Sequence, residues 1–362
     1  MLETVFGRMA GFARRVAAPL VRLVPLLGAG LLAASPAAAA PAAVRELDIA
    51  DYRAYLAEDH PARQGMRRFA QLVEATSGGS LRVRVQTDAL PGSPARQLAA
   101  LREGRPGAPA LMLAAGTGLA ALAPSFVLLD LPYLLRDHAH ADTLLDGPFG
   151  DALLGRLDEG AGLVGLAWWE NGFRQITTAG APLRSAAGLR GLKLRVAGEP
   201  VFVEGARAMG ADPLPLPFGA LYGALKTRRV EAQENFLSQV LSGRLHEVQS
   251  SLTLTDHSYS PLVLVANAAA WRNLDPARQR IVRDAALEAG RFQRCAARAA
   301  ERQARAQLAR HGLAVHALAP AQRARLRTLT APLRAAYFER HGGELLRLYR
   351  LHGDKPPAGG AP

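Results

Sequence analysis

The run LVGLAWW at Leu163–Trp169 is followed directly by the polar sequence ENGFR at Glu170–Arg174. An unbroken apolar run of this length is typical of a strand buried on both faces, as in the parallel sheets of α/β proteins. In open α/β sheets, ligands bind in the crevice at the carboxyl ends of the strands. This stretch therefore predicts an α/β fold and a candidate ligand site just after Trp169.

Strand and helix patterns alternate on both sides of this run. The expected helices are Ala62–Glu74 and Pro94–Arg102, and the expected strands are Leu81–Val85, Ala110–Ala114, Gly191–Val196 and Leu262–Ala266. A long helical pattern from Pro276 to about Arg310 and a second helical region over 319–348 follow. This order predicts two α/β lobes between which the chain crosses more than once.

The chain of 362 residues carries a formal net charge of +13, and all but three of its 44 basic residues are arginines. An excess of this size suggests nucleic acid as a partner. However, the arginines are spread along the whole chain, and only 6% of the residues are aromatic. Because no basic segment carries interleaved stacking residues, no nucleic-acid partner is expected. The single cysteine, Cys295, excludes a disulfide framework.

The N-terminus has the pattern of a secretory signal peptide. Arg8, Arg14, Arg15 and Arg22 precede the apolar run Leu23–Ala34, and the small residues SPAAAAPAA follow. The apolar run is too short for a permanent membrane span. We expect cleavage between Ala37 and Ala43 and a periplasmic location for the mature chain.

The motifs of common enzyme classes are absent from the sequence. It has no G-x-S-x-G elbow, no G-x-G-x-x-G after a strand, no Walker loop and no H-E-x-x-H. His138 and His140 are close in sequence, but a pair spaced i,i+2 in a loop is a weak metal signal. The sequence therefore predicts a protein that is not an enzyme, with no cofactor and no metal site.

Polar side chains stand at the expected ends of three strands: Arg174 after the apolar run, Arg195 at the end of GLKLRV, and Gln233–Asn235. Two arginines and an asparagine that converge would suit a carboxylate, since a guanidinium meets both oxygens and an amide adds a third donor. The alternative is that Arg195 is an ordinary charge at a strand end.

At these residues the sequence resembles the DctP-type solute-binding subunits of tripartite ATP-independent periplasmic (TRAP) transporters. The resemblance starts near His60 and runs to about Trp271. Its most specific stretches are WWENGFRQITT (168–178), AAGLRGLKLRV (186–196), PLPFGALYGALKTRRVEAQEN (215–235) and EVQSSLTLTDHSYSPLVLVANAAAW (247–271).

The resemblance implies a two-lobed periplasmic binding protein with crossing hinge strands and long C-terminal helices. On this basis we expect a signal peptide over 1–42, lobe I over 43–171 and 261–300, lobe II over 172–260 and 301–350, and a flexible tail over 351–362.

The resemblance also implies the site. Arg195 would pair with the substrate carboxylate and Arg174 would line the same pocket. Asn235 would supply an amide to the carboxylate, and Phe218 would pack on the ligand. Trp169, Asn171 and Glu234 are further candidates because they adjoin matched positions.

The sequence departs from the family pattern at several positions. Ala232 replaces a glycine, so the turn that presents Asn235 is expected to be altered. Ala220 stands where relatives commonly have a glutamate. The segment Ala114–Leu119 offers few polar side chains, so we expect a small organic carboxylate with an apolar or short tail.

The partners that the resemblance implies are this carboxylate anion and the membrane subunits of a TRAP transporter, with the binding protein as a monomer. Two alternatives stay open at this point: a periplasmic sensor component that presents its ligand to a receptor, and an exported enzyme acting on organic acids.

Overall fold

The computed structural model describes residues 44–353 apart from residues 54, 55, 89 and 159. Contacts divide the chain into two units, Met1–Ala42 and Ala43–Pro362. The expected signal peptide and the last nine residues of the expected tail lie outside the described residues. The second unit is described below.

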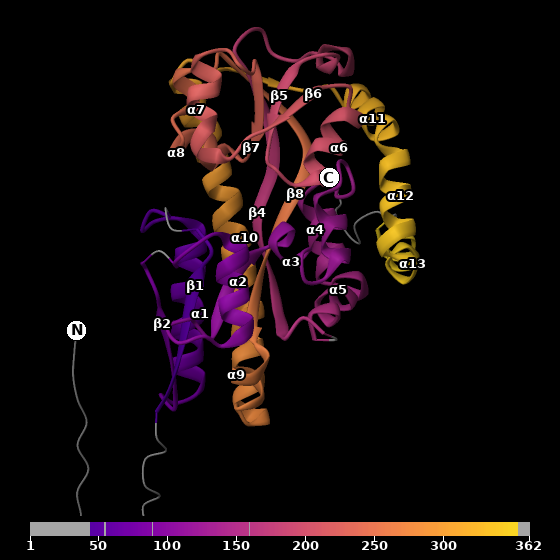
Figure 1. Cartoon of the computed structure of the whole chain (residues 1–362). Helices are drawn as coiled ribbons and strands as arrows, with labels where there is room; N and C mark the ends of the chain where they lie inside the picture. Colours follow the sequence, from indigo (N-terminus) through magenta and orange to yellow (C-terminus); the bar gives the residue numbers. More distant parts are fainter. Residues whose placement is uncertain (1–43, 54–55, 89, 159, 354–362) are drawn as a thin grey trace, which may run out of the picture. The chain divides into compact units, whose positions relative to one another are not determined.

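The described residues form one nine-stranded mixed sheet in the order β2-β1-β3-β8-β4-β7-β5-β6, with β9 paired to β8. The strands are β1 Arg45–Asp51, β2 Leu81–Val85, β3 Leu111–Ala115, β4 Leu163–Thr178, β5 Lys193–Val196, β6 Asp212–Pro215, β7 Ala232–Asn235, β8 Ser251–Asn267 and β9 Ala314–Ala317. We call the side with β1–β3 the first lobe and the side with β5–β7 and β9 the second lobe. The antiparallel strands β4 and β8 run through both (Figure 1).

Helices cover both faces of this sheet. They are α1 Pro61–Thr76, α2 Pro94–Glu103, α3 Gly116–Leu119, α4 His138–Leu145, α5 Pro148–Asp158, α6 Pro200–Ala208, α7 Phe218–Lys226, α8 Leu237–Ser242, α9 Ala268–Arg272, α10 Pro276–Arg310, α11 Pro320–Leu329, α12 Ala331–His341 and α13 Gly343–His352. Short 3₁₀ helices lie at η1 Pro124–Asp130, η2 Ala186–Leu189 and η3 Leu245–Glu247. The prediction of a two-lobed α/β protein with crossing strands and long C-terminal helices is confirmed.

The long helix α10 packs against both lobes (Figure 1). It starts where Asp275 accepts a hydrogen bond from the backbone N–H of Arg278, with Pro276 in the first helical position. Its first half shares an apolar core with α1 and β1–β3, and its last turns share another core with α7 and α8. The helix therefore links the two lobes by apolar packing, while the exact lobe boundaries stay a prediction.

The sequence interpretation is wrong about where β4 ends. The strand continues from Leu163 through the polar residues to Thr178 and stays paired with β8. Its register shifts between Glu170 and Gly172, where Gly172 has a φ of +105° that favours glycine. The backbone N–H and C=O of Glu170 are bonded there by the side-chain amide of Gln293 on α10. Because this amide satisfies the irregular backbone, the strand can carry polar residues from one lobe to the other.

The segment Gln233–Asn235 also differs from expectation, since it forms β7 itself instead of following a strand. Ala232 begins this strand and pairs with Thr178 of β4 and Leu194 of β5. Its backbone is not in the left-handed region, so alanine replaces the family's glycine there without strain.

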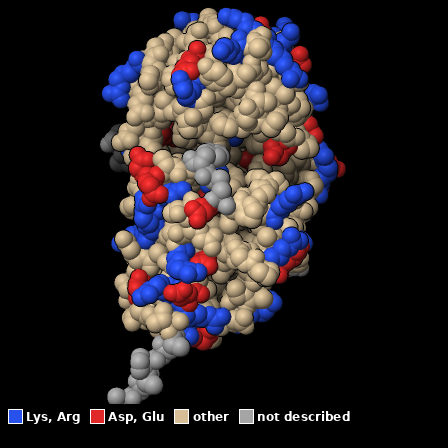
Figure 2. Space-filling view, turned by 60° about the vertical axis from the view of Figure 1, so that its left-hand side comes forward, with Lys and Arg blue, Asp and Glu red and all other residues tan. Residues whose placement is uncertain are grey.

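Charged side chains on the surface are mixed. On the face shown in Figure 2, acidic side chains are interspersed with the basic ones. No helix of the described residues is long and apolar enough to cross a membrane.

Candidate functional site

A cavity of about 190 Å³ lies where the two lobes meet. Its lining comes from the carboxyl-terminal ends of β1, β3, β5 and β7 and from the middle of β4 and β8. The wall from the first lobe is largely apolar, with Leu98, Met112 and Ala114. The opposite wall carries Arg174, Phe202 and Phe236. The cavity thus joins an apolar surface to a charged one.

Arg174 is buried at the charged wall, with its guanidinium between two aromatic rings. The carbon at the centre of the guanidinium lies 4.8 Å from the ring centre of Phe202 and 4.7 Å from that of Phe236. Its Nε and Nη2 atoms donate to the carboxylate of Glu234, with 2.8 Å between Nη2 and Oε1. Such a sandwich holds the guanidinium plane in one orientation.

Each member of the Arg174–Glu234 pair favours the charged form of the other. Burial by itself would raise the pKa of Glu234, but the charge of Arg174 and the nearby His257 lower it to about 2. Burial likewise opposes the charge on Arg174, and Glu234 outweighs it, so the pKa of Arg174 is raised. The charge that Arg174 brings to the cavity is therefore already balanced by a protein carboxylate.

Arg195 has no such partner. Its side chain is 3% exposed, and its Nε and Nη2 atoms both donate to the backbone carbonyl of Leu216, at 2.9 and 2.6 Å. Among the described residues, no carboxylate forms an ion pair with it. Burial and the charge of Arg174 lower the pKa of Arg195, although Glu234 and Glu199 act in the opposite direction. A buried cation without a counterion is costly, so this position favours an anion.

Asn235 lies in β7 next to this charged group and is 1% exposed. Its side-chain carbonyl accepts a hydrogen bond from the backbone N–H of Phe236 at 3.1 Å. Within the described part of the chain, no acceptor is bonded to its Nδ2 atom, which leaves one amide donor for another group.

Of the seven predicted residues, only Arg174 and Asn171 line the cavity; Arg195, Glu234 and Asn235 are buried in the neighbouring strands, and Trp169 and Phe218 lie in other cores. Trp169 is fully buried between α1 and α10, where its indole N–H donates to the carbonyl of Ala286 at 3.2 Å. Phe218 begins α7 and packs against the core of α7 and α8. Neither lines the cavity. The rings at the cavity are instead Phe202 and Phe236.

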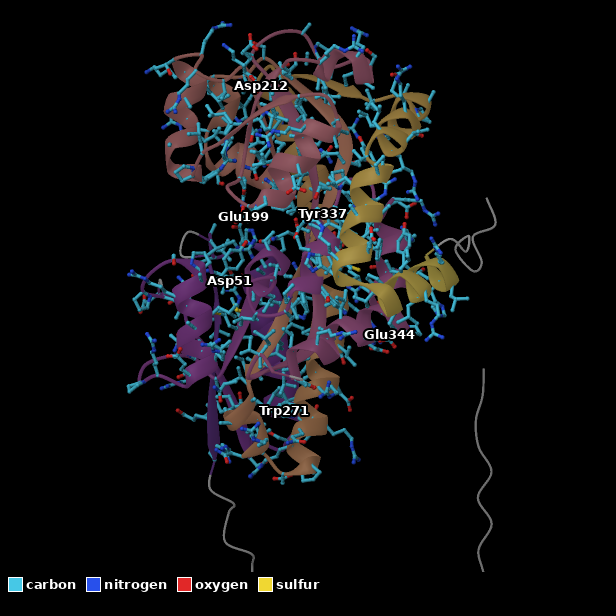
Figure 3. The ribbon with its side chains drawn as sticks, turned by 45° about the vertical axis from the view of Figure 1, so that its right-hand side comes forward. Asp51, Glu199, Asp212, Trp271, Tyr337 and Glu344 are labelled. Carbon is cyan, nitrogen blue, oxygen red and sulfur yellow. The ribbon has the colours of Figure 1, made fainter. Side chains whose placement is uncertain are left out.

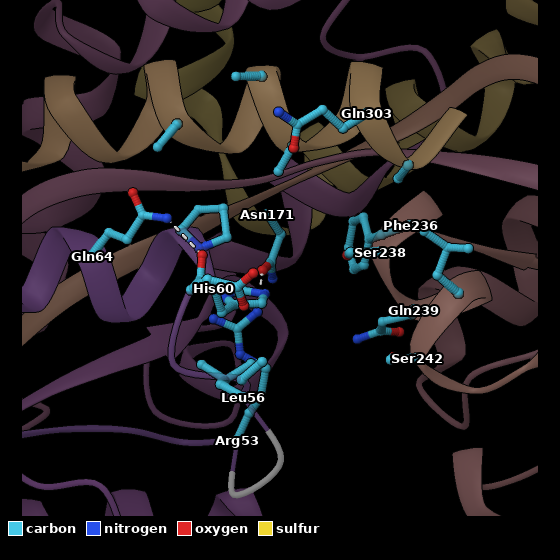
Figure 4. A pocket seen from close by; sticks show the side chains of 18 of the residues that line it. Arg53, Leu56, His60, Gln64, Asn171, Phe236, Ser238, Gln239, Ser242 and Gln303 are labelled. Atoms are coloured by element: carbon cyan, nitrogen blue, oxygen red, sulfur yellow. Dashed lines mark hydrogen bonds between the residues drawn. The ribbon is translucent and has the colours of Figure 1, made fainter. Parts of the chain in front are cut away.

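Asn171 stands between this cavity and a second, larger one of about 690 Å³ (Figure 4). The larger cavity is bounded by α1, α8 and α10. The side-chain carbonyl of Asn171 accepts a hydrogen bond from Nη1 of Arg53 at 2.6 Å. Asn171, Phe236 and Gln239 line both cavities, so the two spaces are neighbours.

Six polar residues of the smaller cavity were missed by sequence reasoning: Tyr52, Thr117, Asp130, Glu199, Gln239 and Ser260. Figure 3 places Glu199 on the second lobe, facing the first lobe, where Asp51 lies. Asp130 had a usable signal, because it is a single acid inside the apolar run FVLLDLPYLL at 126–135. An isolated acid in such a run is buried and needs a specific partner.

Chemically, Arg174 at the cavity and the buried Arg195 on the strand β5 supply positive charge that would attract an anion. In the described part of the chain, no three or more His, Cys, Asp and Glu side chains gather where they could hold a metal ion.

The chain is similar to a family of known proteins. The family model described as bacterial extracellular solute-binding protein, family 7, matches residues 53–341. The 2,3-diketo-L-gulonate-binding periplasmic protein of Escherichia coli is 38% identical over 63% of this chain and 68% of its own. The C4-dicarboxylate-binding periplasmic protein of Rhodobacter capsulatus is 32% identical over 69% and 74%.

Solved structures are similar over most of the chain. A TRAP periplasmic solute-binding protein from Ochrobactrum anthropi has a TM-score of 0.80 and 31% identity, over 87% of this chain and 98% of its own. The sugar acid binding protein of Advenella mimigardefordensis, in complex with galactonate, has a TM-score of 0.73 and 30% identity, over 86% and 99%.

Proposed function

The chain belongs to the bacterial extracellular solute-binding proteins of family 7, the DctP family of TRAP transporters, and from this premise we propose its ligand, its mode of binding and its partner. The protein captures a small organic carboxylate in the periplasm by an arginine clamp and delivers it to the membrane subunits of a TRAP transporter. The members and neighbours compared above are binding proteins rather than enzymes, which supports a role without catalysis.

The observation that carries the proposal is the buried Arg195 without a carboxylate partner among the described residues. A ligand carboxylate would supply the missing negative charge. In a closed site the Coulomb attraction would be strong, although desolvation of both ions offsets part of the gain.

Arg174 and Asn235 complete the clamp in this proposal. The Nε and Nη2 atoms of Arg174 are engaged by Glu234, while its Nη1 atom has no hydrogen bond to any described residue and remains for the ligand. The amide Nδ2 of Asn235 is a third donor. Since Glu234 already balances Arg174, one ligand carboxylate leaves the clamp electrically neutral.

The size of the cavity supports a short ligand. A space of about 190 Å³ suits a carboxylate of a few carbon atoms more than an extended sugar acid. Relatives with short ligands occur in the family beside those that bind sugar acids such as galacturonate: a solute-binding protein of Polaromonas has D-erythronate bound and one of Ralstonia eutropha has (S)-2-acetolactate bound. We therefore propose a small monocarboxylate for this chain.

Capture follows from the connections between the lobes. The pair β4–β8 and the helix α10 join them, and bending of these elements would close the lobes on the ligand and exclude water. The closed form would then dock on the membrane subunits.

The test first identifies the bound carboxylate by mass spectrometry after the freshly purified protein has been denatured. The affinity of the Arg195→Ala variant for this carboxylate is then compared with that of the wild type. We expect a loss of about 2–5 kcal/mol by isothermal titration calorimetry. Arg195→Lys keeps the charge but not the planar fork, so its affinity should be intermediate. The exposed Arg190 of the same segment provides the control Arg190→Ala. Unchanged binding by Arg195→Ala would refute the clamp.

A further inference from the structure

Asp130, the last residue of η1, is held at the cavity by two serines of β8. The hydroxyl of Ser260 donates to Oδ1 at 2.7 Å, and the hydroxyl of Ser258 donates to the backbone carbonyl of Asp130 at 3.0 Å. Asp130 is 1% exposed, and its Oδ2 atom has no hydrogen-bond partner among the described residues. A buried polar atom without a partner is destabilising, so an unpaired oxygen in a fixed carboxyl requires an explanation.

Gly116 lies beside this oxygen at the cavity wall. Gly116 and Asp130 both line the space. A β-carbon built on Gly116 would lie 3.8 Å from Oδ2 of Asp130 and 3.7 Å from the ring of Pro261. A larger side chain would therefore fill the volume beside Oδ2. Glycine at this position leaves that volume to a ligand.

The charges around Asp130 indicate what kind of ligand group belongs there. Burial raises the pKa of Asp130 to about 7, while the hydrogen bond from Ser260 and the charge of Arg174 oppose this rise and Glu199 and Glu234 add to it. No described residue forms an ion pair with Asp130. A bound carboxylate nearby would favour the protonated form further. A neutral carboxyl both donates and accepts one hydrogen bond, and its complement is a hydroxyl group, which does both.

We propose that Asp130 is a specificity-determining residue whose Oδ2 atom hydrogen bonds a hydroxyl group of the ligand. The ligand is accordingly a small hydroxycarboxylate, with its carboxylate on Arg195 and its hydroxyl on Asp130. This inference rests on the proposed function, because the arginine clamp orients the ligand toward Asp130. It keeps the short tail expected from the segment Ala114–Leu119 and adds a hydroxyl group to it, because Asp130 also lines the cavity.

The test compares acids that share a carbon skeleton and differ only in hydroxyl groups. The probes are lactate against propionate and D-erythronate against butyrate, titrated into the whole mature protein by calorimetry. The unsubstituted acid of each pair measures the carboxylate clamp alone. The hydroxy acid adds the contact with Asp130. We expect the hydroxy acid of at least one pair to bind about tenfold more tightly or better.

Variants then assign the preference to Asp130. Asp130→Leu should reduce the ratio of the two affinities to about one while leaving the affinity for the unsubstituted acid little changed. Asp130→Asn keeps an acceptor and a donor of the same size, so it should retain part of the preference and shows that the site still folds. The exposed Asp284 on α10 gives the controls Asp284→Leu and Asp284→Asn, which should leave the ratio unchanged.

The outcomes separate this inference from the proposed function. Equal binding of the paired acids by the wild-type protein, or a preference that persists in Asp130→Leu, would overturn the role of Asp130 and leave the clamp standing. Failure of the wild-type protein to bind any of the four acids would count against the proposed small monocarboxylate, and the inference would fall with it. The assignment is supported if the wild-type protein prefers the hydroxy acid, the Asp130→Leu variant loses this preference, and the Asp284 controls keep it.

Discussion

Arg174 and Glu234 face each other across the neighbouring strands β4 and β7, with 2.8 Å between Nη2 and Oε1, and both side chains are almost fully buried. Arg195 lies on the next strand, β5, and has no carboxylate partner in the described part of the chain. Three adjacent strands thus carry one balanced and one unbalanced arginine. Loss of the Glu234 charge and loss of the Arg195 charge should therefore have different effects on stability.

Removing the charge of Glu234 should destabilise the protein strongly. Glu234→Gln leaves Arg174 buried without a counterion, and such a loss costs about 3–5 kcal/mol of unfolding free energy. Urea denaturation measures it, with the exposed Glu231→Gln as the matched control from the same segment. A Glu234→Gln protein as stable as the wild type would show that the pair is not buried as described.

Removing the charge of Arg195 should cost the unliganded protein little stability, because no described ion pair is broken and relief of the buried charge offsets the lost hydrogen bonds to the carbonyl of Leu216. Arg195→Met should also abolish the stabilisation that ligand gives the wild type, which is about 2.7 kcal/mol at a hundred times the Kd. Thermal unfolding with and without the ligand measures both effects. Strong destabilisation of the unliganded Arg195→Met protein would point to a structural role for Arg195.

Asp130 should make stability depend on pH. Burial raises its folded-state pKa to about 7, above the value of about 3.9 in an unfolded chain. Between these values the unfolded chain releases a proton that the folded protein keeps, so the wild type loses stability as the pH rises from 4 to 7. Asp130→Asn escapes this loss. The unfolding free energy of Asp130→Asn should equal that of the wild type at pH 4 and exceed it by about 3–4 kcal/mol at pH 8. An advantage that does not vary with pH would contradict the assignment.

His138 should also make stability fall as the pH rises, but in a higher pH range. It lies 3.3 Å from Glu170 and 3.4 Å from Glu301, and although burial lowers the pKa of His138, these carboxylates raise it to about 9. The resulting stability is fully present below pH 6.5 and is lost as the pH rises through 9. His138→Gln should therefore cost about 1–3 kcal/mol at pH 6, allowing for solvent near the ring, and almost nothing at pH 10. His316→Gln serves as the control; an equal cost at both pH values would exclude a charged His138.

The contact between α1 and β4 should not tolerate even one added carbon. A β-carbon on Gly65 would lie 2.5 Å from the indole of Trp169 and 2.8 Å from Gln293. Gly65→Ala should therefore destabilise the protein by about 1–3 kcal/mol. Gly155 of α5 has nothing within 4 Å of the same position, and Gly155→Ala should stabilise it by about 0.5–1 kcal/mol. Denaturation of the two variants side by side checks the sign of each change, and a stable Gly65→Ala protein would contradict the packing.

Elements with local signals could be predicted from the sequence. The helix α10 has the predicted bounds because Pro276 at its start and the left-handed Gly312 just after its end are recognisable in the sequence. The continuation of β4 had no local signal. The amide that satisfies its irregular backbone belongs to Gln293, 123 residues after Glu170.

The site could also be predicted in part, because some of its residues lie in motifs that are recognisable in the sequence. Arg174, Arg195 and Asn235 follow from family motifs, and the structure brings them to neighbouring strands. Phe218 is itself a matched motif position and Trp169 adjoins one, but the alternation of a strand and the packing of α7 turn them into the core. Asp130 gains its role from Ser260, 130 residues later, a pairing that sequence reasoning did not find.

The central place of β8 has a consequence for how the chain acquires its fold. Strand β3 has β1 on one side and β8 on the other, and β4 likewise lies between β7 and β8. Neither lobe can complete its sheet until residue 267 has been synthesised, and neither gains the cover of α10 until later still. The chain should therefore stay unfolded through about three quarters of its length, with no stable half to form early. A polypeptide that folds late stays unfolded for longer. An unfolded chain is the state in which a protein can pass through a narrow export channel.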